Sequence, residues 1–195
     1  MIRPALLALA LIAAPAAAQF QSDSYKFLQA VRDAKNNDVI EALNKPGATL
    51  VNTKDKSTGE AALHIVARRG DVPYATFLLQ KGADPNIRDA KNNTPLMIAV
   101  EGGQDDVVPV LIAAKANPNL GNTAGETPLI RAVQRRDAAM IRTLLAAKAD
   151  PDQHDIIAGL SARDYANRDT RTPALAKIFA DTPKVSKAAV SGPKL

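Results

Sequence analysis

The chain has 195 residues, and its 25 Lys and Arg residues against 20 Asp and Glu residues give a net charge of +5 at pH 7. It contains no Cys and 2 His, which excludes a disulfide framework, a thiolate metal site and a cysteine nucleophile, and disfavours a multi-His metal cluster. With four Phe, three Tyr and no Trp, an aromatic platform for single-stranded nucleic acid is equally disfavoured.

The first 18 residues have the composition of an export signal. Arg3 precedes an apolar stretch that ends in three consecutive Ala residues at Ala18, and a basic start, an apolar centre and an A-x-A site are typical of a secretory signal peptide. The stretch is shorter than the about 20 residues of a membrane-spanning helix, although an uncleaved anchor is the alternative. We therefore expect a signal peptide at 1–18, cleavage near Ala18, export to a bacterial periplasm, and no membrane span.

The remainder of the chain repeats with a period of 33 residues. Thr-Pro-Leu occurs at 94–96 and again at 127–129, and the same interval joins the closing segments 83–86, 116–119 and 149–152. Thr suits a helix N-cap, Pro suits the first helical position, and the Gly that follows in several units can end the helix in a left-handed conformation. The pattern predicts a helix, a turn, a second helix and an extended turn in every unit.

These units resemble the ankyrin repeat, a 33-residue unit of a β-turn and two antiparallel helices. Residues 125–129 match its opening and residues 81–86 match its close. The resemblance implies an all-α ankyrin-repeat solenoid of about five stacked helix-turn-helix units with β-turn fingers over residues 19–181. The expected units are about 24–57, 58–90, 91–123, 124–157 and 158–181. Residues 182–195 hold two Pro and three Lys without an apolar period, which predicts a disordered basic tail.

Departures from the repeat pattern predict local differences. The resemblance implies a His after Thr-Pro-Leu that acts as a structural strut to the neighbouring loop backbone, and only His64 keeps it, beside Ala61 and Ala62 in place of Thr and Pro. Asn92 replaces the turn glycine of one unit and can adopt a positive φ. Arg136 replaces the glycine between the helices of another unit, so we expect the first helix of that unit to end less cleanly.

The sequence offers no residues for catalysis. His64 has no second His or Cys near it, and His154 falls in an extended turn, where we expect solvent. Asp105 and Asp106 could form an acid–base pair or a cation site, but they lie where a second helix starts, and we interpret them as helix caps. Phosphate-loop, dinucleotide-binding, zinc-protease and nucleophile-elbow patterns are missing. We therefore expect no enzymatic activity, no cofactor and no metal.

The resemblance implies that the first helices and the fingers line a groove that binds other proteins. Placing the repeats in register gives a mildly basic groove with an apolar stripe, and the alternative is a solvated helical face. The partner would be another protein, with an acidic surface, bound by a monomer. The predicted partner-binding residues are Ile65, Arg68, Arg69, Arg88, Ile98, Glu101, Arg131, Gln134 and Arg135.

Two functions remain open from the sequence. We expect a non-enzymatic protein–protein interaction module, an adaptor or stabiliser of another exported protein. The alternative is an accessory factor in periplasmic stress defence, or in cofactor or metal handling, that binds a small ligand. Nucleic-acid binding is not expected, because residues 25–180 hold 21 basic and 18 acidic side chains, far from a dense phosphate-binding stripe.

Overall fold

The computed structural model describes residues 16–45 and 49–183. Residues 1–15 of the predicted signal peptide and residues 184–195 of the predicted tail lie outside the described residues. Within the described ranges the chain forms ten α-helices and one short 3-10 helix. In chain order these are α1 (Ala16–Arg32), α2 (Asn36–Asn44), η1 (Leu50–Asn52), α3 (Ala62–Arg69), α4 (Val72–Gln80), α5 (Pro95–Gly102), α6 (Val107–Ala113), α7 (Pro128–Gln134), α8 (Ala138–Ala146), α9 (Ala162–Arg168) and α10 (Ala174–Ala180).

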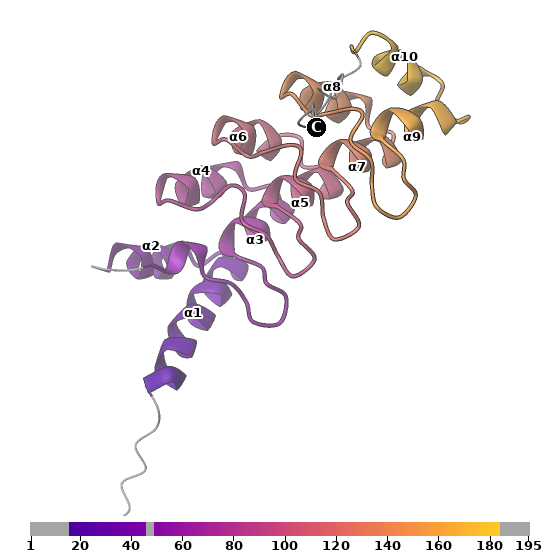
Figure 1. Ribbon diagram of the computed structural model, residues 1–195. Coiled ribbons are helices and arrows are strands. Elements are labelled where there is room, and N and C mark those ends of the chain that lie inside the picture. Colours follow the sequence, from indigo (N-terminus) through magenta and orange to yellow (C-terminus); the bar gives the residue numbers. More distant parts are fainter. Residues whose placement is uncertain (1–15, 46–48, 184–195) are drawn as a thin grey trace, which may run out of the picture.

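The helices stack in two rows (Figure 1). The inner row consists of the odd-numbered helices, in which α1 packs against α3, α3 against α5, α5 against α7 and α7 against α9. The even-numbered helices form the outer row, and each packs against the inner helix of its own unit. This arrangement confirms the all-α solenoid that the sequence predicts.

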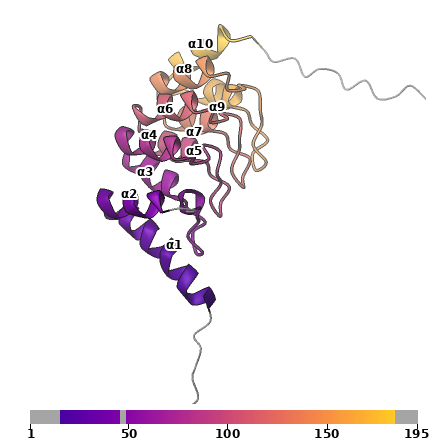
Figure 2. The same ribbon diagram turned by 90° about the vertical axis from the view of Figure 1, so that its left-hand side faces the viewer.

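Four loops lead from an outer helix to the next inner helix, and we call them the first to fourth finger. They comprise residues 53–61, 87–94, 120–127 and 153–161. Figure 2 shows these loops projecting together from one side of the stack. A backbone N–H of each later finger donates to a carbonyl of the finger before it: Ala90 to Thr58 at 3.0 Å, Thr123 to Lys91 at 2.9 Å and Ile156 to Ala124 at 2.8 Å. The fingers therefore form one connected edge.

Leucines at 33-residue intervals build a continuous core. Leu63, Leu96 and Leu129 of the inner row are at most 1% exposed. The outer row contributes the fully buried side chains of Leu78, Leu111 and Leu144. A single helix pair would leave an apolar face in water, so each unit depends on its neighbours to bury that face.

Capping side chains start the inner helices where the repeat pattern places them. Thr94 Oγ1 accepts the N–H of Met97 at 3.2 Å, and Thr127 Oγ1 accepts the N–H of Ile130 at 3.3 Å. In both units a Pro occupies the first turn of the helix, where its missing N–H costs no hydrogen bond. The Thr-Pro pair therefore fixes the first residue of α5 and α7.

The interpretation of Asp105 and Asp106 as helix caps needs a correction. Asp106 is the N-cap of α6, as its position in the repeat suggests, but its side chain makes no capping hydrogen bond. Its backbone is already helical, with φ −76° and ψ −28°, whereas a capping side chain needs an extended backbone at the N-cap. What remains for these carboxylates is a favourable position near the positive end of the helix dipole.

Arg136 closes α7 as a glycine would. It adopts a φ of 58° at the position where the preceding unit has Gly103, with a φ of 65°. The Arg136 N–H donates to the carbonyl of Val133, as that of Gly103 does to Val100, so the expected less clean end is not seen. Asn92 likewise takes a positive φ of 59°. An L-residue pays about 1 kcal/mol or more for this left-handed conformation, so these units carry local strain.

Replacing Lys115 and Lys148 by Gly is expected to stabilise the protein by about 0.5–1 kcal/mol for each site, because the relief of left-handed strain exceeds the entropy cost of Gly. Both Lys side chains are exposed, with φ values of 70° and 66°, and Gly82 occupies the equivalent position with a φ of 88°. Urea unfolding measures the gain. Lys177→Gly inside α10 is the matched control and is expected to cost about 1 kcal/mol; a loss at all three sites contradicts the prediction.

The first helix extends beyond the predicted first unit. α1 starts at Ala16, before the expected boundary near residue 24, so the predicted cleavage site at Ala18 lies within this helix. In Figure 1 the first turns of α1 extend beyond the stack, and the described core residues of α1 start at Phe27. Cleavage near Ala18 stays a prediction. In the described part of the chain, none of the helices combines the length and apolar character needed to cross a membrane.

Candidate protein-binding surface

The side chains predicted to bind a partner lie on the inner row and on the second finger. Arg68, Glu101 and Gln134 are spaced by 33 residues on α3, α5 and α7, and all three are exposed. We call these three residues the inner-row strip. Arg88 lies on the second finger, half-buried, and its backbone carbonyl accepts a hydrogen bond from Lys54 Nζ at 2.7 Å.

The apolar stripe that the sequence predicts is missing at its centre. Ile98 is 6% exposed, and Ile65 is half-buried against the core. α5 packs between α3 and α7, so a side chain on its flank is covered by the neighbouring helices. The prediction that Ile98 offers contact area to a partner is therefore wrong.

Acidic side chains neutralise most of the predicted basic groove. Arg131 Nη2 lies 2.7 Å from Glu101 Oε1, and Arg131 Nη1 lies 3.7 Å from Glu126 Oε1. Arg68 pairs with Glu60 of the first finger. Gln134 Nε2 donates to Glu126 at 3.1 Å. The inner-row strip is therefore a network of charges of both signs rather than a basic track.

Arg69 and Arg135 have a structural function that the sequence did not reveal. Arg69 Nη1 donates to the carbonyl of Val31 at 3.0 Å, and Arg135 Nη1 donates to the carbonyl of Glu101 at 2.8 Å. Each acceptor lies in the last turn of the preceding inner helix, where carbonyls lack intrahelical partners and a cation is favourable. These two Arg residues therefore connect adjacent units, and the partner-binding function predicted for them is not needed to explain them.

His64 is the strut that the resemblance implies. The ring is fully buried, its Nδ1 accepts the N–H of Ala61 at 3.1 Å, and its Nε2 lies 3.0 Å from the carbonyl of Asn93. Accepting at Nδ1 and donating at Nε2 requires the neutral ring. Burial lowers the pKa of His64 below its ordinary value, which favours the same state. These two hydrogen bonds connect the first finger to the second and occupy both ring nitrogens, so neither is left for catalysis.

A side-chain amide just before each of the first three fingers links its unit to the turn of the next unit, a feature that was not predicted from the sequence. Asn86 Oδ1 accepts the N–H of Asn117 at 2.7 Å while its Nδ2 donates to the carbonyl of Lys115 at 3.2 Å. Asn52 and Asn119 make the same pair of bonds in their units. The sequence indicates this link, because Asn recurs at positions 86 and 119, an interval of 33 residues.

The fourth finger exposes the largest apolar side chains at the fingertips. Ile156 is 77% exposed and Ile157 is 83% exposed, higher than any other large hydrophobic residue in residues 23–45 and 49–183. They were not among the predicted partner-binding residues, although two consecutive Ile residues in a turn expected to face solvent are a visible signal in the sequence.

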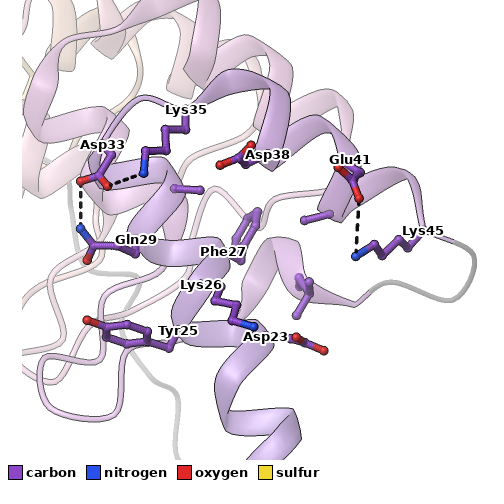
Figure 3. Close-up of a pocket in the computed structure, with 13 residues that line it drawn as sticks. Asp23, Tyr25, Lys26, Phe27, Gln29, Asp33, Lys35, Asp38, Glu41 and Lys45 are labelled. Carbon is purple, nitrogen blue, oxygen red and sulfur yellow. Dashed lines mark hydrogen bonds and ion pairs between the residues drawn. The ribbon is translucent and has the colours of Figure 1, made fainter.

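A cavity of about 420 Å³ lies at the N-terminal end of the stack, between α1 and α2 (Figure 3). Its charged lining residues have both signs. Asp33 pairs with Lys35 at 3.4 Å, and Glu41 pairs with Lys45 at 3.9 Å. Such a balanced lining selects no particular ligand charge. Across residues 16–45 and 49–183, no group of three or more potential metal ligands is placed to hold an ion.

The chain belongs to the ankyrin repeat family. The family model described as "Ankyrin repeats (3 copies)" matches residues 27–122 and 77–155. The repeats of this family are generally protein–protein interaction modules and are typically non-catalytic.

Three curated proteins illustrate the similarity. Neurogenic locus notch homolog protein 1 of Xenopus laevis is 39% identical over 80 residues, which is 41% of this chain and 3% of that protein. Phosphate system positive regulatory protein PHO81 of Saccharomyces cerevisiae is 38% identical over 94 residues, 46% of this chain and 8% of that protein. Neurogenic locus notch homolog protein 1 of Homo sapiens is 42% identical over 74 residues, 38% of this chain and 3% of that protein. The chain thus spans a small part of each relative's length.

Proposed function

We propose that this protein is a non-enzymatic module that binds another exported protein through the inner-row strip and the fingers, and so acts as its adaptor or stabiliser. The observation that carries the proposal is the register of Arg68, Glu101 and Gln134. They project from equivalent turns of three adjacent helices and are exposed, and each also bonds a neighbouring side chain of the same surface. Repetition of one exposed position along a rigid stack suits the recognition of a protein surface, which is larger than a small ligand.

The interactions of the charged residues determine which variants can test this proposal. Charge reversal at Arg69 or Arg135 would remove a bond between units and confuse binding with folding, so Arg68→Glu and Glu101→Lys are preferable. The tagged mature chain is used to capture partners from a periplasmic extract, and the captured protein is identified and purified. We expect these two variants to weaken binding to the purified partner about tenfold, as expected for exposed charges in an interface.

Arg142→Glu on the outer helix α8 is the matched control, because Arg142 is exposed on the opposite row. It is expected to bind as the wild type does. The proposal fails if no protein is captured specifically, or if Arg142→Glu weakens binding as much as Arg68→Glu.

Export is part of the proposal and has its own test. The support is the basic start, the apolar stretch and the Ala-rich end of residues 1–18, which are typical of a signal peptide. A mass spectrum of the protein recovered from the periplasm is expected to correspond to a chain that starts at Gln19. A mass that includes Met1 to Ala18, or recovery in the cytoplasm alone, contradicts it.

A further inference from the structure

We propose that the fingertip edge, defined by Lys56, Lys91, Ile156 and Ile157, is the anchoring part of the interface, and that it binds a partner protein whose surface has an apolar pocket next to acidic side chains. The inference rests on the proposed function, because it states which chemistry the protein partner presents. It moves the main contact from the inner helices to the tips of the fingers.

The apolar anchor is the Ile156–Ile157 pair. At 77% and 83% exposure, these side chains stand in solvent at the tip of a connected edge, where nothing in the described chain covers them. A protein leaves large apolar side chains exposed together at a cost in solubility, and such places commonly mark binding sites. The inner-row strip has no comparable apolar contribution, because Ile98 is buried.

The anchor is held rigidly. Asp155 is 6% exposed, its Oδ1 accepts the N–H of Ala158 at 2.6 Å and that of Gly159 at 3.1 Å, and its Oδ2 accepts the hydroxyl of Tyr165 at 2.6 Å. The Ile156 N–H donates to the carbonyl of Ala124 in the third finger at 2.8 Å. A turn that is ordered before binding loses little conformational entropy in a complex. The two Ile side chains are therefore suited to act as an interface anchor.

The basic part of the edge lies on the first two fingers. Lys56 and Lys91 are exposed, whereas the acidic residues beside them are occupied within their own turns. Asp55 bonds Ser57 and Arg32, the latter at 2.9 Å, and Asp89 Oδ1 accepts the N–H groups of Lys91 and Asn93, each at 2.8 Å. The Ser57 hydroxyl, and then the Arg32 guanidinium, hold the pKa of Asp55 well below its usual range. Asp55 is thus ionised and its charge is balanced by Arg32, which leaves Lys56 and Lys91 as exposed cations on the first two fingers; the surface complementary to them is acidic.

Charge also decides which molecule is the occupant. Residues 1–15 and 184–195 lie outside the described residues and contain no Asp or Glu, so neither segment supplies the acidic groups that Lys56 and Lys91 require. A second copy of this chain does not match: with equivalent fingers opposed the Lys residues repel, and with the order reversed they face the Ile156–Ile157 pair, which offers no negative charge. The occupant that satisfies both the basic and the apolar parts is an acidic surface of a different protein.

Photo-crosslinking in cells tests the proposal. The full chain carries p-benzoylphenylalanine in place of Ile157, Gln134 or Ile40 in three separate strains, and the cross-linked protein is identified by mass spectrometry and purified. Ile40 on α2 is the control, because it is an exposed apolar residue, at 41%, on a helix of the outer row. We expect one specific product from position 157, formed with a protein whose cross-linked region is acidic, and none from position 40.

The affinity for the purified partner completes the test. Ile157→Ser is expected to weaken binding about tenfold or more, and Lys56→Glu with Lys91→Glu is expected to weaken it and to flatten its dependence on salt. Ile40→Ser is expected to bind as the wild type does. Ile157 does not contribute to the core, so unchanged thermal unfolding of Ile157→Ser is expected to show that only binding is affected.

The outcomes separate the two proposals. A specific product from position 134 without one from position 157 overturns the fingertip anchor and leaves the proposed function standing. No specific product from either position contradicts both. A product with the mass of two copies of this chain, or a partner region without acidic residues, overturns the chemistry proposed for the occupant.

Discussion

Lowering the pH from 7.5 to 5.5 is expected to destabilise the wild-type protein by up to about 1.4 kcal/mol per pH unit, the limit for one linked proton. The cause is His64, whose buried neutral ring holds the N–H of Ala61 and the carbonyl of Asn93. Burial lowers the pKa of His64 in the folded state, so the unfolded chain takes up a proton that the folded chain refuses. Its full stabilising effect is present above the unfolded pKa of about 6.5 and is lost as the pH falls toward the folded pKa.

Urea unfolding at pH 7.5, 6.5 and 5.5 measures this dependence, and His64→Gln is expected to remove most of it while lowering stability at every pH. Asp55 and Asp164 have folded pKa values below the ordinary one, so their stabilising contributions are lost only below about pH 4 to 5, outside this window. His154 is half-exposed, and His154→Gln is the matched control that keeps the decline. A flat stability between pH 7.5 and 5.5 in the wild type contradicts the function assigned to His64.

The repeat architecture was predictable because it depends on spacing. Leu63, Leu96 and Leu129 are buried at the same position of successive units, and the Thr94 and Thr127 caps follow from a side chain and the backbone three residues later. The caps depend on residues close together in the chain, and the buried Leu positions recur at a fixed interval. Both can therefore be recognised in a single sequence. The same reasoning identified His64, since its position in the repeat determines which loop it reaches.

The surface was less predictable, because a residue's exposure and charge depend on neighbouring units. Ile98 is apolar and in register with Ile65, yet packing on both sides of α5 buries it. Arg69 and Arg135 look like free cations in the sequence, but carbonyls 38 and 34 residues away accept their hydrogen bonds. Ile157 was not predicted to bind a partner, since an apolar residue in a repeat protein is ordinarily taken for core, yet its side chain is exposed.

Arg163→Ala is expected to cost the last unit about 2–3 kcal/mol, a large effect for a polar residue near the chain end. Its guanidinium pairs with Asp152 at 2.7 Å and donates to the carbonyl of Thr182 at 3.2 Å and to that of Phe179. The Arg163 side chain is 12% exposed. Removing it would take the guanidinium donors away from the partly buried carbonyls of Phe179 and Thr182, which is costlier than losing an exposed ion pair.

The structure also explains why this end of the stack differs from the middle. Asp152 stands where the earlier units have Asn86 and Asn119, and a carboxylate, unlike an amide, has no N–H to donate to a carbonyl of the following unit. A carboxylate at this position binds Arg163 instead, and Arg163 covers the C-terminal end of α10. Terminal repeats need such polar closure, since one of their faces meets water.

Hydrogen exchange of α10 is the measurement for Arg163, because the last unit of a solenoid can open before the rest unfolds. A cost of about 2–3 kcal/mol corresponds to a loss of protection of about 30- to 150-fold in residues 174–180. Arg163→Lys keeps the charge but not the branched donors, so its loss is expected to be intermediate. Arg168→Ala, an exposed site one turn further along α9, is expected to change protection little. Equal protection of α10 in Arg163→Ala and Arg168→Ala would mean that closure of the last unit depends on the apolar contacts of Leu175 and Phe179 and not on the guanidinium.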